Sequence, residues 1–225
     1  RWIMSNIVIT GANRGIGLAL ARLYNDRGEN VIAVCRESSD ELDALGLRVE
    51  SGIDVTDGDL LTDLASRLSS IDIDVLINNA GVMRPTSFDE IENQLDAFRL
   101  QFEVNSLAPL RVTRALVDRL GTGSKVAIIT SRMGSIADND SGGHYGYRMS
   151  KTAVNMGGVS MALELKERSI AVGLLHPGYV RTEMTGNTGH VGPEESAGGL
   201  VQRIDELSIE RTGRFFHANG EELPW

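Results

Sequence analysis

The sequence contains a single cysteine, Cys35, which excludes an internal disulfide and any zinc site built from a cysteine cluster. Basic residues are also few: 22 Lys and Arg against 31 Asp and Glu give a net charge of −9. That balance argues against nucleic acid or an anionic membrane as the main partner. No apolar run approaches the ~20 residues that a membrane span needs, and the first residues do not resemble a secretory signal. We therefore expect no metal site, no membrane partner and a cytoplasmic location.

The chain has 225 residues, which predicts one domain spanning 1–225 with one substantial core. Three residues precede Met4, and the natural chain could begin at this methionine. Strands are predicted at 6–10, 31–35, 47–55, 74–81, 124–131, 169–178 and 213–217, and helices at 15–28, 39–45, 57–69, 87–120, 145–168 and 193–207. This alternation predicts an α/β fold of right-handed βαβ units, with a mainly parallel, doubly wound sheet covered by helices on both faces.

Two irregular polar stretches, residues 132–144 and 183–194, each follow the end of a predicted strand. In open α/β sheets, ligands bind in the crevice outside the carboxyl ends of the strands. We expect these two loops to build the substrate site. The second loop is short and poor in apolar bulk, which predicts an open and unselective site.

The stretch TGANRGIG (10–17) follows the first predicted strand and opens the first predicted helix. Gly11 permits a tight turn, Gly15 lets the backbone approach a phosphate, and Gly17 allows the helix to pack closely on the strand. Free amides at the start of the helix then favour a pyrophosphate. The alternative is a glycine-rich turn that holds no ligand, but a strand before and a helix after are what a dinucleotide-binding loop requires.

Cys35 and Arg36 stand at the end of the second predicted strand, where NAD-binding proteins usually carry an acidic residue for the ribose hydroxyls. Arg14 lies within the glycine loop and could point the same way. Two guanidinium groups can hold a 2′-phosphate by charge-assisted hydrogen bonds, so we expect NADPH to be preferred over NADH. Glu37 weakens this prediction, although it lies one residue past the expected position. The alternative is that both arginines are solvated surface residues.

The chain has four tyrosines, and Tyr147 stands four residues before Lys151 in YRMSK (147–151). At the start of a helix this spacing puts both side chains on one face. A phenol beside an ammonium group is unusual as packing but useful when the phenol must give up a proton. Tyr145 is a competing candidate, although it is six residues from Lys151 and therefore lies on a different helical face.

Further motifs join these two stretches in an order that spans nearly the whole chain. The full set is TGANRGIG (10–17), Asp54, NNAG (78–81), Asn105 within FEVNSLAPL, Ser131 within ITSRMGS, YRMSK (147–151) and HPGYVRT (176–182). With this set the sequence resembles the single-domain short-chain dehydrogenase/reductases. Its shortness, the CR after the second strand and the ending GEELPW resemble the C-factor and sniffer-like carbonyl reductases within that family. The resemblance implies a seven-stranded Rossmann-type sheet and a Ser–Tyr–Lys active site with an assisting Asn.

The resemblance implies a role for each catalytic residue. Tyr147 would give a proton to the developing alkoxide. Lys151 would lower the pKa of that phenol from its usual ~10 and would hold the nicotinamide ribose. Ser131 would hydrogen-bond the substrate oxygen and orient it. Taken alone, Ser131 could instead cap the end of a strand.

Asn105 lies in the middle of the predicted helix 87–120, and the resemblance implies that it continues a proton relay from the lysine through a water. Pro109, four residues later, removes one helical hydrogen bond back to residue 105 and supports a local distortion there. Taken alone, Asn105 could instead be an ordinary residue on the helix surface.

The resemblance also implies the contacts of the adenosine end of the cofactor. Asp54 would accept a hydrogen bond from the adenine amino group. Residues Asn79 to Gly81 would lie beside the adenosine ribose, and Asn78 would tie down the neighbouring strand.

The motif HPGYVRT would hold the nicotinamide end. Pro177 and Gly178 would turn the chain beneath the ring, and the Val180 backbone and Thr182 would hold its carboxamide. His176 is expected to have a buried structural role rather than a catalytic one. The complete set of expected cofactor-binding residues is Gly11, Asn13, Arg14, Gly15, Ile16, Gly17, Arg36, Asp54, Val55, Asn79, Ala80, Gly81, Tyr147, Lys151, Pro177, Gly178, Val180 and Thr182.

These residues predict the NADPH-dependent reduction of an aldehyde or ketone to an alcohol, or the reverse oxidation. The alternative is an NADP-binding regulatory or signalling protein with slow or vestigial turnover, because some proteins of the resembled subgroup are linked to signalling. Loss of the tyrosine or the lysine would have favoured that alternative, and neither is lost. A sugar-nucleotide epimerase is disfavoured, because the chain is too short to hold the substrate domain of those relatives.

The expected partner is a small-molecule carbonyl or alcohol together with further copies of the chain. In the resembled family, the outer faces of the helices corresponding to 87–120 and 145–168 commonly form a two-fold contact. A homodimer or homotetramer is therefore expected, through the apolar residues Leu100, Val104, Leu107, Val154, Met161 and Leu165.

Overall fold

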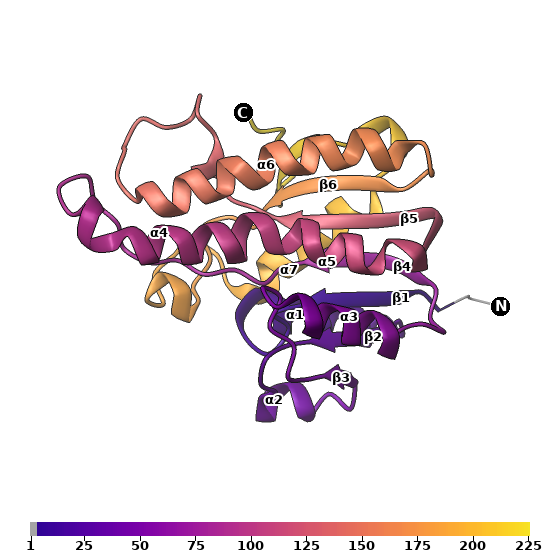
Figure 1. The fold of residues 1–225 in the computed structure, drawn as a ribbon. Coiled ribbons are helices and arrows are strands. Elements are labelled where there is room, and N and C mark those ends of the chain that lie inside the picture. Colours follow the sequence, from indigo (N-terminus) through magenta and orange to yellow (C-terminus); the bar gives the residue numbers. More distant parts are fainter. Residues whose placement is uncertain (1–3) are drawn as a thin grey trace.

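The structure is a computed structural model that describes residues 4–225, so the residues before Met4 lie outside it. Seven strands form one sheet in the order β3-β2-β1-β4-β5-β6-β7, and every neighbouring pair is parallel (Figure 1). The order reverses between β1 and β4, as in doubly wound Rossmann-type sheets, which confirms the predicted fold class. The strands are β1 Asn6–Thr10, β2 Asn30–Val34, β3 Arg48–Glu50, β4 Ile73–Asn78, β5 Leu120–Ile129, β6 Ala171–His176 and β7 Phe215–His217.

Helices cover both faces of this sheet. Side chains of α1, α2 and α7 share one buried apolar cluster with one face of the strands, and side chains of α3, α5 and α6 share another with the opposite face. Figure 1 shows α4 and α5 following one another end to end on the side of the second face, with α6 running alongside them. The helices are α1 Gly15–Asp26, α2 Asp40–Asp43, α3 Gly58–Arg67, α4 Leu95–Phe102, α5 Ala108–Leu116, α6 Tyr145–Lys166 and α7 Pro193–Asp205.

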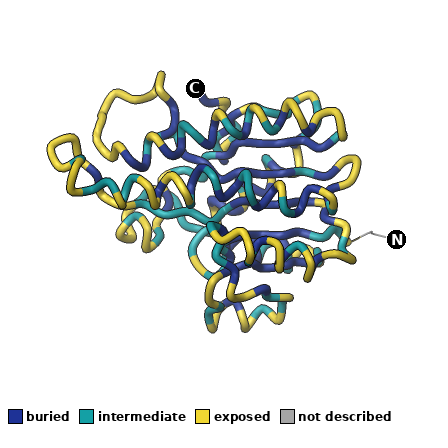
Figure 2. Tube along the Cα trace, in the orientation of Figure 1, coloured by how far each residue is buried: buried dark blue, intermediate teal, exposed yellow. Residues whose placement is uncertain are grey.

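The central strands of the sheet carry apolar residues at consecutive positions, as the sequence indicated. Ile7, Val8 and Ile9 of β1 are all buried, and the run Val31–Val34 of β2 is buried as well. Such runs are typical of parallel strands that are covered on both faces. Figure 2 shows the same layering, with buried strands inside and exposed residues on the outer helix faces and in the loops.

The prediction of a single helix over 87–120 is wrong, because the helical region is shorter than predicted and is not continuous. Residues 91–94 form a 3₁₀ turn before α4, and a π-helical segment, Glu103–Leu107, separates α4 from α5. Pro109 lies in the first turn of α5 and has no N–H to donate to the Asn105 carbonyl. This missing hydrogen bond is a local cause of the π-helical segment. The distortion predicted at this point is therefore present.

Two predicted strands differ most from their bounds in the structure. The strand predicted at 47–55 is only Arg48–Glu50, because Gly52, with a φ of 79°, turns the chain away from the sheet. The strand predicted at 124–131 begins earlier, at Leu120, directly after a 3₁₀ turn.

The prediction that Val154, Met161 and Leu165 of α6 contact another copy of the chain is wrong. Val154 and Leu165 are buried in the protein's own core, and Met161 packs against that core. Besides Tyr145 at its first position, the large apolar residues of α6 that are exposed are Met149, Met156 and Leu163, spaced seven residues apart. In residues 4–225, no helix combines the length and the apolar character that crossing a membrane requires.

Candidate active site

Four neighbouring strands bring the predicted site residues to one edge of the sheet. Strands β1, β4, β5 and β6 are adjacent and parallel, so their carboxyl ends lie side by side. The glycine loop follows β1, Asn79 to Gly81 follow β4, Ser131 follows β5 and the 177–182 segment follows β6. The reversal of strand order between β1 and β4 is where such sheets bind nucleotides.

Tyr147 and Lys151 lie on the same buried face of α6, one turn apart. The Lys151 Nζ is 5.7 Å from the centroid of the Tyr147 ring and donates a hydrogen bond of 3.0 Å to the carbonyl of Ile129, the last residue of β5. Tyr145, the competing tyrosine, is 37% exposed and packs its ring against Phe88 at a centroid distance of 6.0 Å. The helical-face argument therefore separates the two tyrosines as expected.

Burial controls the acidity of both groups. It raises the pKa of Tyr147 to about 12, and a hydrogen bond with Ser131 opposes that rise. It also lowers the pKa of Lys151 to about 8, because the charged ammonium is removed from water. Burial therefore moves the Tyr147 pKa in the direction opposite to the lowering expected from Lys151. A phenol with a raised pKa stays protonated at neutral pH and can act as a proton donor.

Ser131 caps the 3₁₀ turn Arg132–Gly134, and its hydroxyl accepts a hydrogen bond of 3.1 Å from the Met133 N–H. The turn rests directly on α6, where the Thr152 hydroxyl donates to the Gly134 carbonyl at 2.9 Å. Sequence reasoning missed Gly134 and Thr152. The signal was the glycine three residues after Ser131 in ITSRMGS, since only a small residue fits a turn pressed against a helix.

Asn105 is 1% exposed, so the alternative of a surface residue is wrong. Its amide nitrogen donates to the Val82 carbonyl at 2.8 Å and to the Ser150 hydroxyl at 3.0 Å, and its oxygen accepts from the Val82 N–H at 2.8 Å. A Cβ built on Gly81 would lie 3.4 Å from the Asn105 oxygen and 3.9 Å from the Lys151 Nζ. Asn105, Gly81 and Lys151 therefore converge, and the asparagine braces the end of β4 against α6.

The glycine loop has the geometry of an anion cradle. Gly11 and Gly15 have positive φ angles of 66° and 54°, and a Cβ on Gly17 would lie 2.2 Å from the Gly11 carbonyl oxygen. Helix α1 starts at Gly15 without a side-chain cap, which leaves the N–H groups of its first turn, including those of Ile16 and Gly17, directed at the crevice. Asn13 also belongs to this loop, where its carbonyl accepts a bond of 2.7 Å from Ser39.

Asn79 fixes the glycine loop to β4. Its side-chain amide donates to the carbonyls of Thr10 and Gly11, each at 3.1 Å, while the Thr10 hydroxyl accepts from the N–H groups of Asn79 and Ala80, also at 3.1 Å. Asn78 pairs with Ile128 of the neighbouring strand β5, as expected, and its side-chain amide also donates to the Thr113 hydroxyl of α5 at 3.0 Å.

Asp54 and Arg36 lie near one another beyond β2 and β3. The Asp54 carboxylate accepts from the N–H and hydroxyl of Thr56, at 2.9 and 2.7 Å, and these bonds, with a smaller effect of Arg36, lower the pKa of Asp54. Val55 is buried beside it. Arg14 differs from the expectation, because it forms an ion pair with Glu183 of the 183–194 loop.

The segment after β6 lies against the glycine loop. A Cβ on Gly15 would be 3.4 Å from the Thr182 methyl group, and Thr182 forms a reciprocal capping pair with Thr185. Gly178 has a φ of 91° after Pro177, and Val180 is buried and bridges to Val191.

His176 immediately precedes this turn. Its ring meets the edge of the His217 ring at a centroid distance of 4.8 Å. Burial, followed by the nearby His217, Arg132 and Lys151, lowers the pKa of His176 to about 3, so the imidazole stays neutral. A neutral imidazole is consistent with the structural role expected for it.

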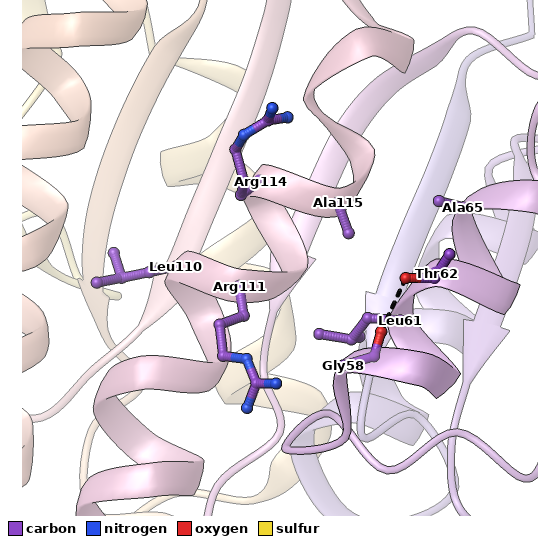
Figure 3. A pocket seen from close by; sticks show the side chains of 8 residues that line it. All are labelled: Gly58, Leu61, Thr62, Ala65, Leu110, Arg111, Arg114 and Ala115. Atoms are coloured by element: carbon purple, nitrogen blue, oxygen red, sulfur yellow. Dashed lines mark hydrogen bonds between the residues drawn. The ribbon is translucent and has the colours of Figure 1, made fainter.

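A surface groove lies apart from these residues. It has a volume of about 670 Å³ and runs between α3 and α5, on the outer side of the second helical layer. Figure 3 shows Leu61 and Ala65 of α3 opposite Arg111 and Ala115 of α5, with Leu110 and Arg114 farther along the lining. None of the residues that line the groove belongs to the predicted site. Arg111, which lines the groove, donates a hydrogen bond of 2.6 Å to the carbonyl of Thr56.

The chain resembles known proteins along most or all of its length. The sequence profile of the family described as short chain dehydrogenase matches residues 5–191. A 1-hydroxy-2-glutathionyl-2-methyl-3-butene dehydrogenase of Rhodococcus sp. (strain AD45) is 42% identical over 229 residues, covering 99% of this chain and 100% of that protein. C-signal of Myxococcus xanthus is 44% identical over 155 residues, covering 68% of this chain and 93% of that protein.

A solved structure shares the fold. The carbonyl reductase from Pseudomonas aeruginosa PAO1 in complex with NADP superimposes with a TM-score of 0.86 and 35% sequence identity, covering 99% of this chain and 100% of that one. The similarity includes the four strands whose ends carry the predicted site.

Proposed function

Because this chain belongs to the short-chain dehydrogenase family, we propose that it transfers hydride between NADP and a carbonyl or alcohol group, with Asn105, Ser131, Tyr147 and Lys151 as its active site. The observation that carries the proposal is the buried contact of Tyr147 with Lys151 beside the Ser131 turn. A phenol and an ammonium group are both removed from water there, at a sheet edge suited to a dinucleotide. Packing alone does not require that combination.

The chain's own residues divide the work of carbonyl reduction. Tyr147 holds its proton at neutral pH and would pass it to the substrate oxygen as that oxygen gains negative charge. Ser131 would hold the same oxygen by a hydrogen bond. Lys151, 5.7 Å from the ring centroid, would stabilise the phenolate that remains. Asn105 would keep Gly81 and α6 at the spacing that this arrangement needs.

NADP fits the residues present and would supply the hydride. The uncapped start of α1 and the glycine backbone offer amide donors for the pyrophosphate. Asp54 offers a carboxylate to the adenine, and Lys151 can reach the nicotinamide ribose. The NADP complex of the carbonyl reductase that shares 35% identity supports the same cofactor here.

Preference for NADPH rests on Arg36. It is exposed at the end of β2, close enough to Asp54 to affect its pKa, and no acidic residue occupies positions 35 or 36 to repel a 2′-phosphate. Arg14 contributes less than first expected, because its guanidinium is already paired with Glu183.

The substrate is proposed to be a small carbonyl compound or alcohol held between loops 132–144 and 183–194. One relative is named for a glutathionyl alcohol and the structural neighbour for carbonyl reduction, so both directions of the same reaction are represented. The whole chain would act as one domain. Copies would associate through the exposed apolar residues of α6 and Leu100 of α4, as a homodimer or homotetramer.

A second candidate is a regulatory or signalling protein that binds NADP and turns over slowly. The 44% identity to C-signal favours it, whereas the retained Tyr147 and Lys151 favour the enzyme. The two are separated by following NADPH oxidation with a panel of aldehydes, ketones, diketones and quinones. Turnover that disappears in Tyr147→Phe supports the enzyme. Tight NADPH binding without turnover on any compound supports the second candidate.

A further inference from the structure

The last residues of the sequence fold back over strand β7. The Leu223 N–H donates to the Phe215 carbonyl and the His217 N–H donates to the Glu221 carbonyl, both at 2.8 Å, which makes a short antiparallel pairing. Leu223 is buried in an apolar cluster with Leu174 and Phe215. Residues 219–225, here called the strap, are therefore fixed to the sheet.

The strap contacts the 132–144 loop at two points. Arg132 donates a hydrogen bond of 2.7 Å to the Glu221 carboxylate. The Ala137 N–H donates to the Trp225 carbonyl at 2.9 Å. The Arg132 Nε also lies 3.2 Å from the Asp138 carboxylate of the loop, which is an ion pair without hydrogen-bond geometry. The Arg132 guanidinium therefore hydrogen-bonds the strap and places its charge beside a carboxylate of the loop.

These contacts hold one half of a loop that is otherwise exposed. Its far half, residues 141–143, is held by Arg148, whose guanidinium donates to the Gly142 and Gly143 carbonyls at 3.2 Å and to the Ser141 hydroxyl at 2.8 Å. Its near half is held by the two strap contacts and by the Thr152 bond to Gly134. Figure 2 shows the loop as a long exposed segment that stands away from the helices beneath it.

We propose that Arg132 is a positioning residue for substrate binding, acting through Glu221 and the strap. It directly follows Ser131 and is the first residue of the turn that rests on Lys151, so the direction in which the loop leaves the active site is set at Arg132. The substrate part of this inference rests on the proposed function. The positional part, that the strap orders residues 136–143, stands independently of it.

Glu221 and Glu222 provide a matched pair of variants within the strap. Glu221 meets Arg132 of the loop, whereas its neighbour Glu222 meets Arg214 of the chain entering β7. In Glu221→Gln, we expect hydrogen exchange to become faster in the amides of 136–143 and the KM for the carbonyl to rise by about two- to fivefold, the upper range for loss of one partly exposed ion pair. The kcat and the Kd for NADPH should change less than about twofold. Glu222→Gln should leave exchange in the loop and KM unchanged.

Two variants of Arg132 complete the test. Arg132→Gln should raise the loop exchange rate and the KM as Glu221→Gln does. Arg132→Lys should give values of both that lie between those of Arg132→Gln and the parent protein. Equal loop exchange in the Glu221 and Glu222 variants would overturn the proposal, whatever the activity. Faster loop exchange with an unchanged KM would show that the strap orders the loop but does not position substrate. If the parent protein reduces no carbonyl, the proposed function fails while the exchange comparison still decides whether the strap holds the loop.

Discussion

Gly134 and Lys151 are in direct backbone contact. A Cβ built on Gly134 would lie 2.7 Å from the Lys151 carbonyl carbon and 3.0 Å from the Asn155 amide nitrogen. The turn that carries Ser131 therefore reaches the helix that carries Tyr147 and Lys151 only because residue 134 has no side chain. The relative placement of three catalytic residues depends on this contact.

Replacing Gly134 by alanine should consequently damage both stability and activity. The added methyl group has no room, so the turn must move away from α6, at a cost of about 1–3 kcal/mol in the free energy of unfolding. The kcat should fall at least about tenfold because Ser131 moves with the turn. Urea unfolding and steady-state kinetics measure the two effects. Gly198→Ala in α7 is the control, since a Cβ there meets no atom within 4 Å. Unchanged kcat in Gly134→Ala would contradict the argument.

Removal of the Tyr147 hydroxyl should abolish most turnover. Tyr147→Phe keeps the ring, so the fold and the affinity for NADPH should survive, while kcat should fall by the 10²–10⁴ typical of losing a positioned acid. Lys151→Met should lower kcat and weaken NADPH binding together. Tyr145→Phe is the control, because that ring packs on Phe88 and should matter little. Steady-state kinetics with one carbonyl and a cofactor titration measure these effects. Full activity in Tyr147→Phe with loss in Tyr145→Phe would mean that the acid is Tyr145.

Burial of Lys151 should make stability depend on pH. Its pKa is lowered from 10.5 to about 8, so between these pH values the unfolded chain holds more protons than the folded protein. The free energy of unfolding should therefore rise with pH in this window, by about 1–2 kcal/mol between pH 7.5 and 9.5. Lys151→Met should lack this rise, while other titrating groups cancel in the comparison. Chemical unfolding of both proteins across the window measures it. Parallel stability curves would show that the ammonium is not desolvated.

Arg36 should determine the preference for NADPH. Arg36→Ala should weaken NADPH binding about tenfold or more, the range for a lost hydrogen bond to a charged group, and should barely change NADH binding. Fluorescence titration with both cofactors measures the difference. Arg22→Ala is the control, an exposed arginine of α1 that pairs with Glu194. Tighter binding of NADH than NADPH by the parent protein would refute the preference.

Exposed apolar residues of α6 should support association between copies. Met156 and Leu163 are 70% and 68% exposed and two turns apart on one side of the helix. Changing both to lysine should convert a dimer or tetramer into a monomer without unfolding it, because neither side chain contributes to the core. Met4→Lys is the control, since Met4 is exposed and precedes β1, far from α6 in the sequence. Light scattering at micromolar concentration measures the mass, and a monomeric parent protein would end this proposal.

Much of the fold could be predicted because its signals are local. Continuous apolar runs such as Val31–Val34 marked the parallel strands, and the four-residue spacing of Tyr147 and Lys151 placed both on one helix face. The extent of the helix predicted over 87–120 was wrong because helical periodicity does not show where a helix ends and a strand begins, although Pro109 did mark the distortion near Asn105. Val154 and Leu165 were wrongly predicted for association for a related reason, whereas Leu100 is 40% exposed as that prediction requires: an apolar side chain on a helix can pack in the core as well as against a partner.

The sequence by itself determined the order of strands and helices, the glycine loop and the pairing of Tyr147 with Lys151, because each depends on residues close together in the chain. Only the tertiary structure decided which groups lose contact with water, and that reversed the expected shift in the Tyr147 pKa. It also decided the contacts between distant segments: Asn105 with Ser150, Gly134 with Lys151, and Arg132 with a glutamate 89 positions later. The physical reason is that desolvation and close packing arise only in the folded interior. The segments that meet there are far apart in the sequence, and no periodic pattern of residues shows which of them will be in contact.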